Sequence, residues 1–231
     1  MWKKQRKPSR HQARTLITDL NPKSPIAEQF RTIRTNINFS FVDTDMETLM
    51  VTSSGPSEGK SSITANLAVV FAQQGKSVLL IDADLRKPTL HYTLRTNNTV
   101  GLSSCLVGTQ TLEETVQTTA IDNLYAMTSG PIPPNPSELL GSRAMRKLIH
   151  DARAKYDVVI FDTPPVLAVT DAQILSNLCD GTILVVRHKQ TDIEQAKRAK
   201  ELLDKAEGKL IGTVLNDMNK QKQNYYYYYG D

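Results

Sequence analysis

The stretch SSGPSEGKSS, residues 53–62, lies between a short apolar run, TLMVTS (48–53), and a segment with a helical pattern, KSSITANLAVVFAQQ (60–74). A strand that passes through a glycine-containing turn into a helix is the context of a phosphate-binding loop. Backbone N–H groups and the helix N-terminus would surround a polyphosphate, Lys60 would neutralise its oxygens, and the Ser61 hydroxyl would bind magnesium. The residues expected to bind the nucleotide are Ser54, Gly55, Pro56, Ser57, Glu58, Gly59, Lys60, Ser61 and Ser62.

The loop departs from the usual pattern G-x-x-x-x-G-K-[ST] at one place, because Ser54 stands at the first glycine position and Gly55 follows it. The structural alternative is a glycine- and serine-rich turn that only caps a buried helix. Such a turn has no need of a charged side chain at Lys60, so the sequence favours phosphate binding.

Three aspartates follow later apolar runs. Asp82 and Asp84 stand two residues apart in LLIDADLRKP (79–88), and Asp162 follows DVVIF (157–161). Ligands of open α/β sheets bind at the carboxyl ends of the strands, where these acids would lie beside the loop. They suggest a magnesium shell, with strand-end turns as the alternative. Asn216, at the end of IGTVLN (211–216), could bond a purine edge or form an Asx-turn.

Short apolar runs alternate with helical patterns along most of the chain. Several runs are apolar without alternation, as expected for strands covered on both faces. We therefore expect an α/β fold of the P-loop NTPase type, with a doubly wound, mostly parallel sheet, helices on both faces and a single domain. The predicted strands are 48–53, 77–83, 123–129, 156–162, 181–187 and 210–216, and the predicted helices are 24–41, 60–74, 135–156 and 193–208.

The composition agrees with one globular domain, since the chain has 231 residues, of which 39% are hydrophobic and 23% charged. The longest apolar runs are far shorter than the roughly 20 residues that a membrane helix needs. No signal peptide precedes them, so we expect a cytoplasmic protein. Cys105 and Cys179 lie far apart without a C-x-x-C partner, which argues against a disulfide framework, a zinc site or an iron–sulfur site.

The two ends of the chain differ from the domain. Residues 1–21 are expected to be a basic, flexible arm, either simply solvated or attracted to acidic lipid by about 1 kcal/mol per basic residue. No nucleic-acid-binding motif accompanies the arm, so nucleic acid is not expected as a partner. Residues 22–220 form the predicted domain. The tail, 221–231, contains NYYYYYGD (224–231), whose five tyrosines nothing would bury; a sticky, functionless terminus is the alternative.

Three of these motifs, SSGPSEGKSS, LLIDADLR (79–86) and VVIFDTPP (158–165), resemble the P-loop ATPases of the chromosome-partitioning and septum-site type. Those ATPases have a signature lysine where this chain has Gly55. The D-x-D-x-R element (82–86), EQFRTIR (28–34) and the tyrosine tail instead resemble the bacterial tyrosine kinases (BY-kinases) of capsule and exopolysaccharide operons. Together, PKSPIAEQFRTIRTNI (22–37), SGPIPPNPSELL (129–140) and DTPPVLAVTDAQ (162–173) resemble the stand-alone cytoplasmic subunit of Gram-positive bacteria.

This resemblance implies an ATP- and Mg²⁺-dependent protein-tyrosine kinase. Lys60 matches the loop lysine, Ser61 the magnesium-binding hydroxyl, and Asp82 and Asp162 the carboxylates around the metal. Asp84 matches the residue that positions or deprotonates the incoming tyrosine. The implied autophosphorylation sites are Tyr225, Tyr226, Tyr227, Tyr228 and Tyr229.

The resemblance also implies a ring-like homo-oligomer in which Glu28, Arg31 and Arg34, on a helix at about 25–41, contact a neighbouring subunit. An ion pair between Glu28 and Arg31 within the helix is the alternative for two of these residues. Further implied partners are a transmembrane polysaccharide co-polymerase adaptor that recruits the kinase to the inner face of the membrane, a cognate protein-tyrosine phosphatase, and sugar-nucleotide enzymes as substrates.

Two other functions remain open at this point. One is a partitioning-type ATPase that hydrolyses ATP and modifies no protein, although Gly55 in place of the signature lysine counts against it. The other is a non-catalytic assembly module, in which the nucleotide holds an oligomer together and the tyrosines are contacts.

Overall fold

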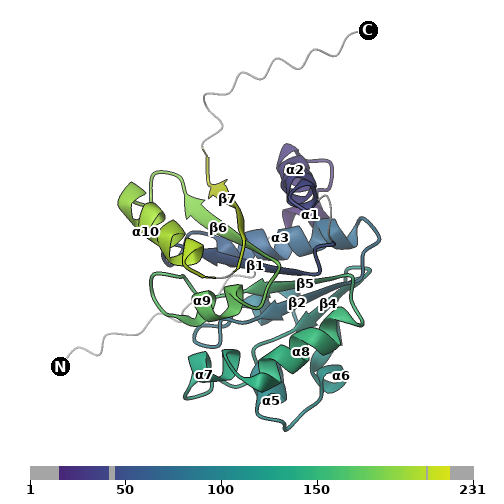
Figure 1. The fold of residues 1–231 in the computed structure, drawn as a ribbon. Coiled ribbons are helices and arrows are strands. Elements are labelled where there is room, and N and C mark those ends of the chain that lie inside the picture. Colours follow the sequence, from purple (N-terminus) through teal and green to yellow (C-terminus); the bar gives the residue numbers. More distant parts are fainter. Residues whose placement is uncertain (1–15, 42–44, 207, 219–231) are drawn as a thin grey trace, which may run out of the picture.

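The computed structural model describes residues 16–41, 45–206 and 208–218. Its centre is a seven-stranded sheet with the order β3-β4-β2-β5-β1-β6-β7 (Figure 1). Neighbouring strands are parallel throughout, except that β3 and β4 are antiparallel. The strands are β1 (Thr48–Ser53), β2 (Val78–Asp82), β3 (Val116–Thr118), β4 (Leu124–Met127), β5 (Val158–Asp162), β6 (Gly181–Arg187) and β7 (Leu210–Asn216).

Helices cover both faces of this sheet (Figure 1). The helices are α1 (Ile17–Leu20), α2 (Pro25–Phe39), α3 (Lys60–Ala72), α4 (Leu90–Leu94), α5 (Leu102–Leu106), α6 (Leu112–Thr115), α7 (Pro136–Leu140), α8 (Arg143–Arg153), α9 (Asp171–Ser176) and α10 (Ile193–Asp204). Successive side chains of β1 enter two separate apolar clusters. Met50 packs with residues of α8, α9 and α10, whereas Leu49 and Val51 pack with residues of α2 and α3. The predicted α/β, doubly wound fold is confirmed.

All six predicted strands are present, and the structure adds the short strand β3 at one edge of the sheet. The prediction of one helix over residues 135–156 is wrong, because the segment forms two helices, α7 and α8. The chain turns at Gly141 and Ser142, and the Ser142 hydroxyl accepts a hydrogen bond of 3.2 Å from the backbone N–H of Met145. A serine N-cap of this kind starts a new helix, and this is why the pattern does not continue as one.

The structure also differs from the flexible arm expected up to residue 21. Residues 17–20 form α1, which lies against α3, and Thr18 is fully buried there. The Thr18 N–H and hydroxyl donate to Asn66 Oδ1 at 3.1 and 2.8 Å, and Gln73 Nε2 donates to the Thr18 carbonyl at 3.0 Å. These polar contacts join α1 to the domain, so the domain begins several residues earlier than predicted. The basic residues of the arm lie outside the described residues.

In the part of the chain that the structure describes, none of the helices has both the length and the apolar character needed to cross a membrane.

Candidate active site

The phosphate-binding loop joins β1 to α3 and contacts the end of β7. Gly59, the residue before α3, has a φ of +91°, in the left-handed region that favours glycine. A Cβ atom at Gly59 would lie 2.1 Å from Asn216 Nδ2, and this amide donates a hydrogen bond of 2.9 Å to the Glu58 carbonyl. Asn216 therefore contacts the loop backbone, which the sequence did not predict, and its suggested purine contact stays a prediction.

Glu58 stabilises the conformation of the phosphate-binding loop through hydrogen bonds of its carboxylate. It is buried, and its Oε2 accepts a hydrogen bond of 2.8 Å from the backbone N–H of Ser54. Its Oε1 accepts one of 2.6 Å from the Thr191 hydroxyl, in the segment between β6 and α10. Arg187 adds a further contact by donating from Nη1 to the Ser57 carbonyl at 3.0 Å. We infer that Glu58, expected among the nucleotide-binding residues, acts through the shape of the loop.

Lys60 lies at the centre of the site, where the loop meets the ends of β2 and β5. Its Nζ is 3.2 Å from Asp84 Oδ2, 3.4 Å from Asp162 Oδ1 and 3.3 Å from the Ser61 hydroxyl oxygen. Burial lowers the pKa of Lys60, but the nearby carboxylates of Asp162, Asp84 and Asp82 outweigh this effect and raise it. The ammonium group is therefore charged, and it neutralises acids that would otherwise repel one another.

Asp82 and Asp162 are neighbours across the sheet, because they are register partners at the ends of the parallel strands β2 and β5. Asp82 is fully buried; its Oδ1 accepts from the N–H of Asp84, and its Oδ2 accepts from the N–H groups of Thr89 and Leu90. Burial and the charge of Asp162 raise the pKa of Asp82 to about 7. Asp82 thus shapes the loop after β2 and holds a proton far more tightly than an exposed aspartate.

The fit of a magnesium ion can be judged from the free oxygen atoms. Asp162 Oδ2 is buried and has no hydrogen-bond partner among the described residues, so it is available to a cation. The Ser61 hydroxyl lies beside the same lysine. Asp82, whose carboxylate already accepts three backbone N–H groups, is less suited to direct binding. No group of three or more acidic, histidine or cysteine side chains in the described ranges forms a ready metal site.

This arrangement fits Mg²⁺, which is commonly held by one or two carboxylates, water and the phosphates of a substrate. Asp162 and Ser61 would hold the ion, with Asp82 beside Asp162 at the end of the neighbouring strand. The metal set of Ser61, Asp82 and Asp162 stays a prediction.

The sequence singled out five residues that the structure brings together: Lys60, Ser61, Asp82, Asp84 and Asp162. It did not single out Thr191, which bonds Glu58, nor Ser137 and Asp171, which bond Arg86. These partners lie 51 to 133 residues away along the chain, so no local spacing indicates them. Ser137 and Asp171 do stand inside the quoted motifs SGPIPPNPSELL and DTPPVLAVTDAQ, which is the signal that could have pointed to them.

The three residues expected at a subunit interface lie on α2. Arg31 donates to Glu28 Oε2 at 2.7 Å and to the Pro22 carbonyl at 2.6 Å, so the intrahelical ion pair is present. Arg34 Nη1 donates to the Val70 carbonyl on α3 at 2.5 Å, a contact within the chain that was not predicted. Its Nε is buried without a hydrogen-bond partner in the described part of the chain. Burial and the charge of Arg31 lower the pKa of Arg34.

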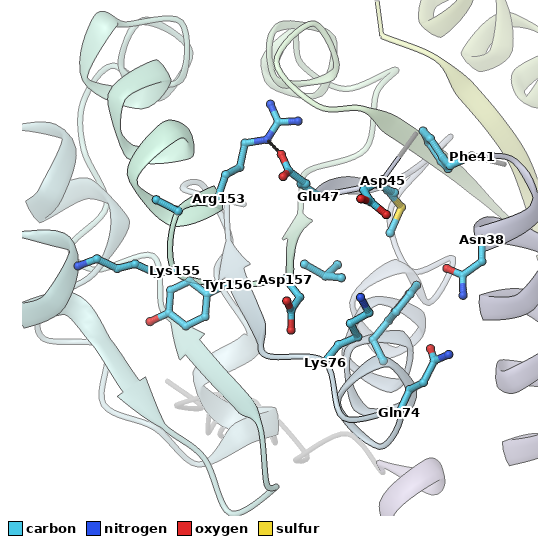
Figure 2. Close-up of a pocket in the computed structure, with 14 residues that line it drawn as sticks. Asn38, Phe41, Asp45, Glu47, Gln74, Lys76, Arg153, Lys155, Tyr156 and Asp157 are labelled. Atoms are coloured by element: carbon cyan, nitrogen blue, oxygen red, sulfur yellow. Dashed lines mark hydrogen bonds and ion pairs between the residues drawn. The ribbon is translucent and has the colours of Figure 1, made fainter. Parts of the chain in front are cut away.

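The predicted phosphorylation sites, Tyr225 to Tyr229, lie outside the described residues. A cavity of about 470 Å³ lies at the opposite end of the sheet from the phosphate-binding loop, beside the residues that precede β1, β2 and β5 (Figure 2). Charged side chains of both signs line it, among them Glu47, Lys76, Arg153 and Asp157. It shares no residue with the candidate active site.

Comparison with known proteins agrees with this geometry. The ParA family model, described as NUBPL iron-transfer P-loop NTPase, matches residues 46–225. The chain is 54% identical over 217 residues to the tyrosine-protein kinase YwqD of Bacillus subtilis, covering 94% of this chain and 92% of that protein. It is 37% identical over 222 residues to the tyrosine-protein kinase Wzc of Salmonella typhimurium, covering 95% of this chain but 31% of that protein. The crystal structure of the chimerical protein CapA2B2 matches with a TM-score of 0.86 and 46% identity, covering 89% of this chain and 90% of that one.

Fold, loop and family model together define a P-loop NTPase of the ParA class. Within that class, the chain belongs to the bacterial tyrosine-protein kinases.

Proposed function

We propose that this chain is an ATP- and Mg²⁺-dependent protein-tyrosine kinase that phosphorylates its own C-terminal tyrosines, Tyr225 to Tyr229. The proposal rests above all on the group of Lys60, Asp84 and Asp162 at the end of the phosphate-binding loop. Asp84 is the most accessible of the three carboxylates at this point, with 9% of its side chain exposed, whereas Asp82 and Asp162 are fully buried. A carboxylate at the entrance of a phosphate-binding site can position an incoming hydroxyl group and accept its proton.

The reaction joins the phenolic oxygen of a tyrosine to the γ-phosphorus of ATP, breaks the bond between that phosphorus and the β–γ bridging oxygen, and releases ADP. A phenol has a pKa of about 10 and is a poor nucleophile at neutral pH, so it must be aligned and deprotonated as it attacks. Asp84 would accept its proton. Lys60 and the loop N–H groups would stabilise the charge on the transferred group, and bound Mg²⁺ would neutralise the phosphates held with it.

The length of the tail supports the assignment of the acceptor tyrosines. Asn216 contacts the phosphate-binding loop, and Tyr225 to Tyr229 follow it by nine to thirteen residues. A chain of that length spans up to roughly 30–45 Å. The tail could therefore reach its own site or that of a neighbouring subunit.

A membrane partner is also proposed. The chain aligns with about a third of Wzc, so the longer protein has a large part with no counterpart here. We propose that a separate transmembrane polysaccharide co-polymerase adaptor supplies the equivalent part, recruits this chain to the inner face of the membrane and links it to capsular or extracellular polysaccharide synthesis. A cognate protein-tyrosine phosphatase would remove the phosphates from the tail, and sugar-nucleotide enzymes are proposed as further substrates.

A ring-like homo-oligomer would place the tails near neighbouring active sites. The buried Nε of Arg34, which has no partner in the described chain, supports a role for this residue at a subunit contact. Arg31 lies about one turn and Glu28 about two turns earlier on the same helix. Their mutual ion pair is partly exposed, and both residues would contribute to the same contact.

The family match also keeps a hydrolysing, partitioning-type ATPase as a second candidate, because the ParA model covers residues 46–225. Gly55 at the position of the signature lysine argues against it.

Mapping of phosphopeptides after incubation with Mg²⁺ and ATP separates the candidates. We expect phosphate on Tyr225 to Tyr229 and none on a variant in which all five are phenylalanine. Equal incorporation into both would refute the tail assignment, and ATP consumption without any incorporation would favour the hydrolase.

A further inference from the structure

Arg86 makes a paired contact with a buried carboxylate next to the candidate active site. Asp171 is fully buried at the start of α9. Its Oδ2 accepts from Arg86 Nε at 2.9 Å, and its Oδ1 accepts from Arg86 Nη2 at 3.0 Å and from the Ser137 hydroxyl at 2.8 Å. Arg86 Nη2 also lies 3.0 Å from Ser137 Oγ. We call this group of three residues the Arg86 fork.

The fork joins three segments that are distant in sequence. Arg86 belongs to the loop between β2 and α4, Ser137 to α7, and Asp171 to α9. The loop between β2 and α4 also contains Asp84, two residues before Arg86. Asp84 Oδ1 accepts from the N–H of Lys87 at 3.0 Å, so the residues on either side of Arg86 share one hydrogen-bonded turn. A shift of Arg86 would therefore shift Asp84.

A planar guanidinium that binds both oxygens of a carboxylate fixes position and direction, which a lysine ammonium does not. Burying such a pair contributes little dependable stability, because the loss of hydration offsets much of the attraction. We therefore attribute the contact between the partly exposed Arg86 and the fully buried Asp171 to the position that it fixes, rather than to a gain in stability.

We propose that Arg86, held by Asp171 and Ser137, is a positioning residue that sets Asp84 in place for the incoming tyrosine and ties that loop to α7 and α9. This inference rests on the proposed function, in which Asp84 accepts the phenolic proton. Among the residues that the structure describes, Arg86 makes no hydrogen bond or ion pair with the phosphate-binding loop, so its effect on phosphoryl transfer passes through Asp84.

The chain offers a matched control at the other end of the sheet. Arg153 Nε donates to Glu47 Oε2 at 2.5 Å (Figure 2). Its Nη2 donates to both oxygens of Asp180 at 2.7 and 2.9 Å. Its side chain is 34% exposed, compared with 38% for Arg86. Arg153→Lys therefore disrupts another arginine–carboxylate contact, made by an arginine of similar exposure to less buried acids, far from Asp84.

The test compares Arg86→Lys with Arg153→Lys in the full chain, by steady-state tyrosine phosphorylation at varied ATP concentration. Both variants keep the positive charge and lose the paired geometry. We expect Arg86→Lys to lower kcat by about tenfold to a hundredfold, because small displacements of reacting groups have effects of this size. The KM for ATP should stay within about twofold, since the phosphate-binding loop is untouched. Arg153→Lys should leave both parameters within about twofold.

Two further measurements guard against a general loss of structure. Ser137→Ala removes one hydroxyl group and should lower kcat by a few-fold, with a melting temperature close to that of the unchanged chain. Added guanidinium should partly restore kcat to Arg86→Ala, whereas the same concentration of ammonium should not.

Wild-type kcat in Arg86→Lys, or equal losses in Arg86→Lys and Arg153→Lys, would overturn the role of the fork while leaving the kinase assignment intact. A fall in ATP affinity that accounts for the whole loss would overturn it as well. If the unchanged chain transfers no phosphate to tyrosine, the proposed function fails, and the role of the fork fails with it.

Discussion

At the scale of single residues, the site depends on how one lysine and three aspartates share charge in a small volume. Lys60 Nζ contacts Asp84 and Asp162, and Asp82 lies one strand away in register with Asp162. A buried negative charge is unfavourable unless it is paired, and these three acids are accommodated in two ways. Asp84 and Asp162 contact the lysine, whereas Asp82 is bonded to backbone N–H groups and has a raised pKa.

The role of Asp84 leads to a prediction. Asp84→Asn keeps the size of the side chain but removes the base, so tyrosine phosphorylation should fall by about 100-fold or more. Nucleotide affinity should change by only a few-fold, because Lys60 and the loop are retained. Phosphorylation rates and equilibrium nucleotide titration measure the two effects. Asp157→Asn, at the other end of the sheet, is the control. Equal phosphorylation rates in both variants would contradict the role of Asp84.

The pKa of Asp82 gives a second prediction. Since burial and Asp162 raise this pKa from 3.8 to about 7, the folded chain binds the proton more tightly than the unfolded chain. The stability that Asp82 contributes is therefore complete below about pH 4 and is lost as the pH rises through about 7. Carbon-13 NMR of the Asp82 carboxyl group in the nucleotide-free protein should show a titration midpoint near 7. A midpoint near 4 would show that the group is not desolvated.

Sequence reasoning found the residues that belong to local motifs and missed those that reach the site from elsewhere. Lys60 begins α3, Asp82 and Asp162 end β2 and β5, and Asp84 follows β2 by two residues. The rule that ligands of α/β sheets bind at the carboxyl ends of the strands therefore places all four at one edge of the sheet. The partners that hold the site in shape come from helices and loops that are distant in sequence. Asp171, for example, is 85 residues from Arg86. Asp, Ser and Thr are common surface residues, and only the folded structure shows that Asp171 is fully buried and that Ser137 and Thr191 are partly buried.

At the scale of elements, the turn from β1 into α3 sets the shape of the phosphate site, and its two glycines differ. Gly59 has a φ of +91° and a close neighbour in Asn216, whereas a Cβ at Gly55 would meet nothing closer than 3.7 Å. Gly59→Ala should lower the free energy of unfolding by about 1–3 kcal/mol, because an alanine in the left-handed region is strained. Gly55→Ala should change it by about 0.5 kcal/mol or less. Urea denaturation of both variants measures the difference, and equal losses would contradict this account of the turn.

The elements themselves were largely predictable from hydrophobic pattern, because buried parallel strands are short and continuously apolar. The exceptions have physical causes. β3 has three residues at an antiparallel edge and is only partly buried, so its sequence, VQT, shows little pattern. The break between α7 and α8 depends on a serine cap inside a segment whose apolar spacing continues. α1 has four residues and is held by buried polar contacts with Asn66. Hydrophobic periodicity cannot predict contacts of this kind.

At the scale of the whole molecule, we expect the charge of the tail to control the proposed assembly. The chain has a formal net charge of +4, and five phosphotyrosines would add roughly −8 to −10. We expect unmodified tails to favour a ring-like assembly and modified tails to weaken it by repulsion. Native mass spectrometry before and after incubation with Mg²⁺ and ATP should therefore show a shift toward smaller species. An unchanged distribution after complete phosphorylation would refute this form of regulation, without bearing on the kinase activity itself.

The most direct test of the central claim is intact-mass spectrometry of the purified full chain with Mg²⁺ and ATP, with and without Lys60→Met. The variant removes the ammonium group that contacts Asp84 and Asp162. We predict successive mass increases of one phosphate each on the unchanged chain, up to five, because the tail holds five consecutive tyrosines. We predict none on the variant. Phosphate on both chains, or on neither while ATP is still consumed, would contradict the account of this site as a tyrosine kinase centre.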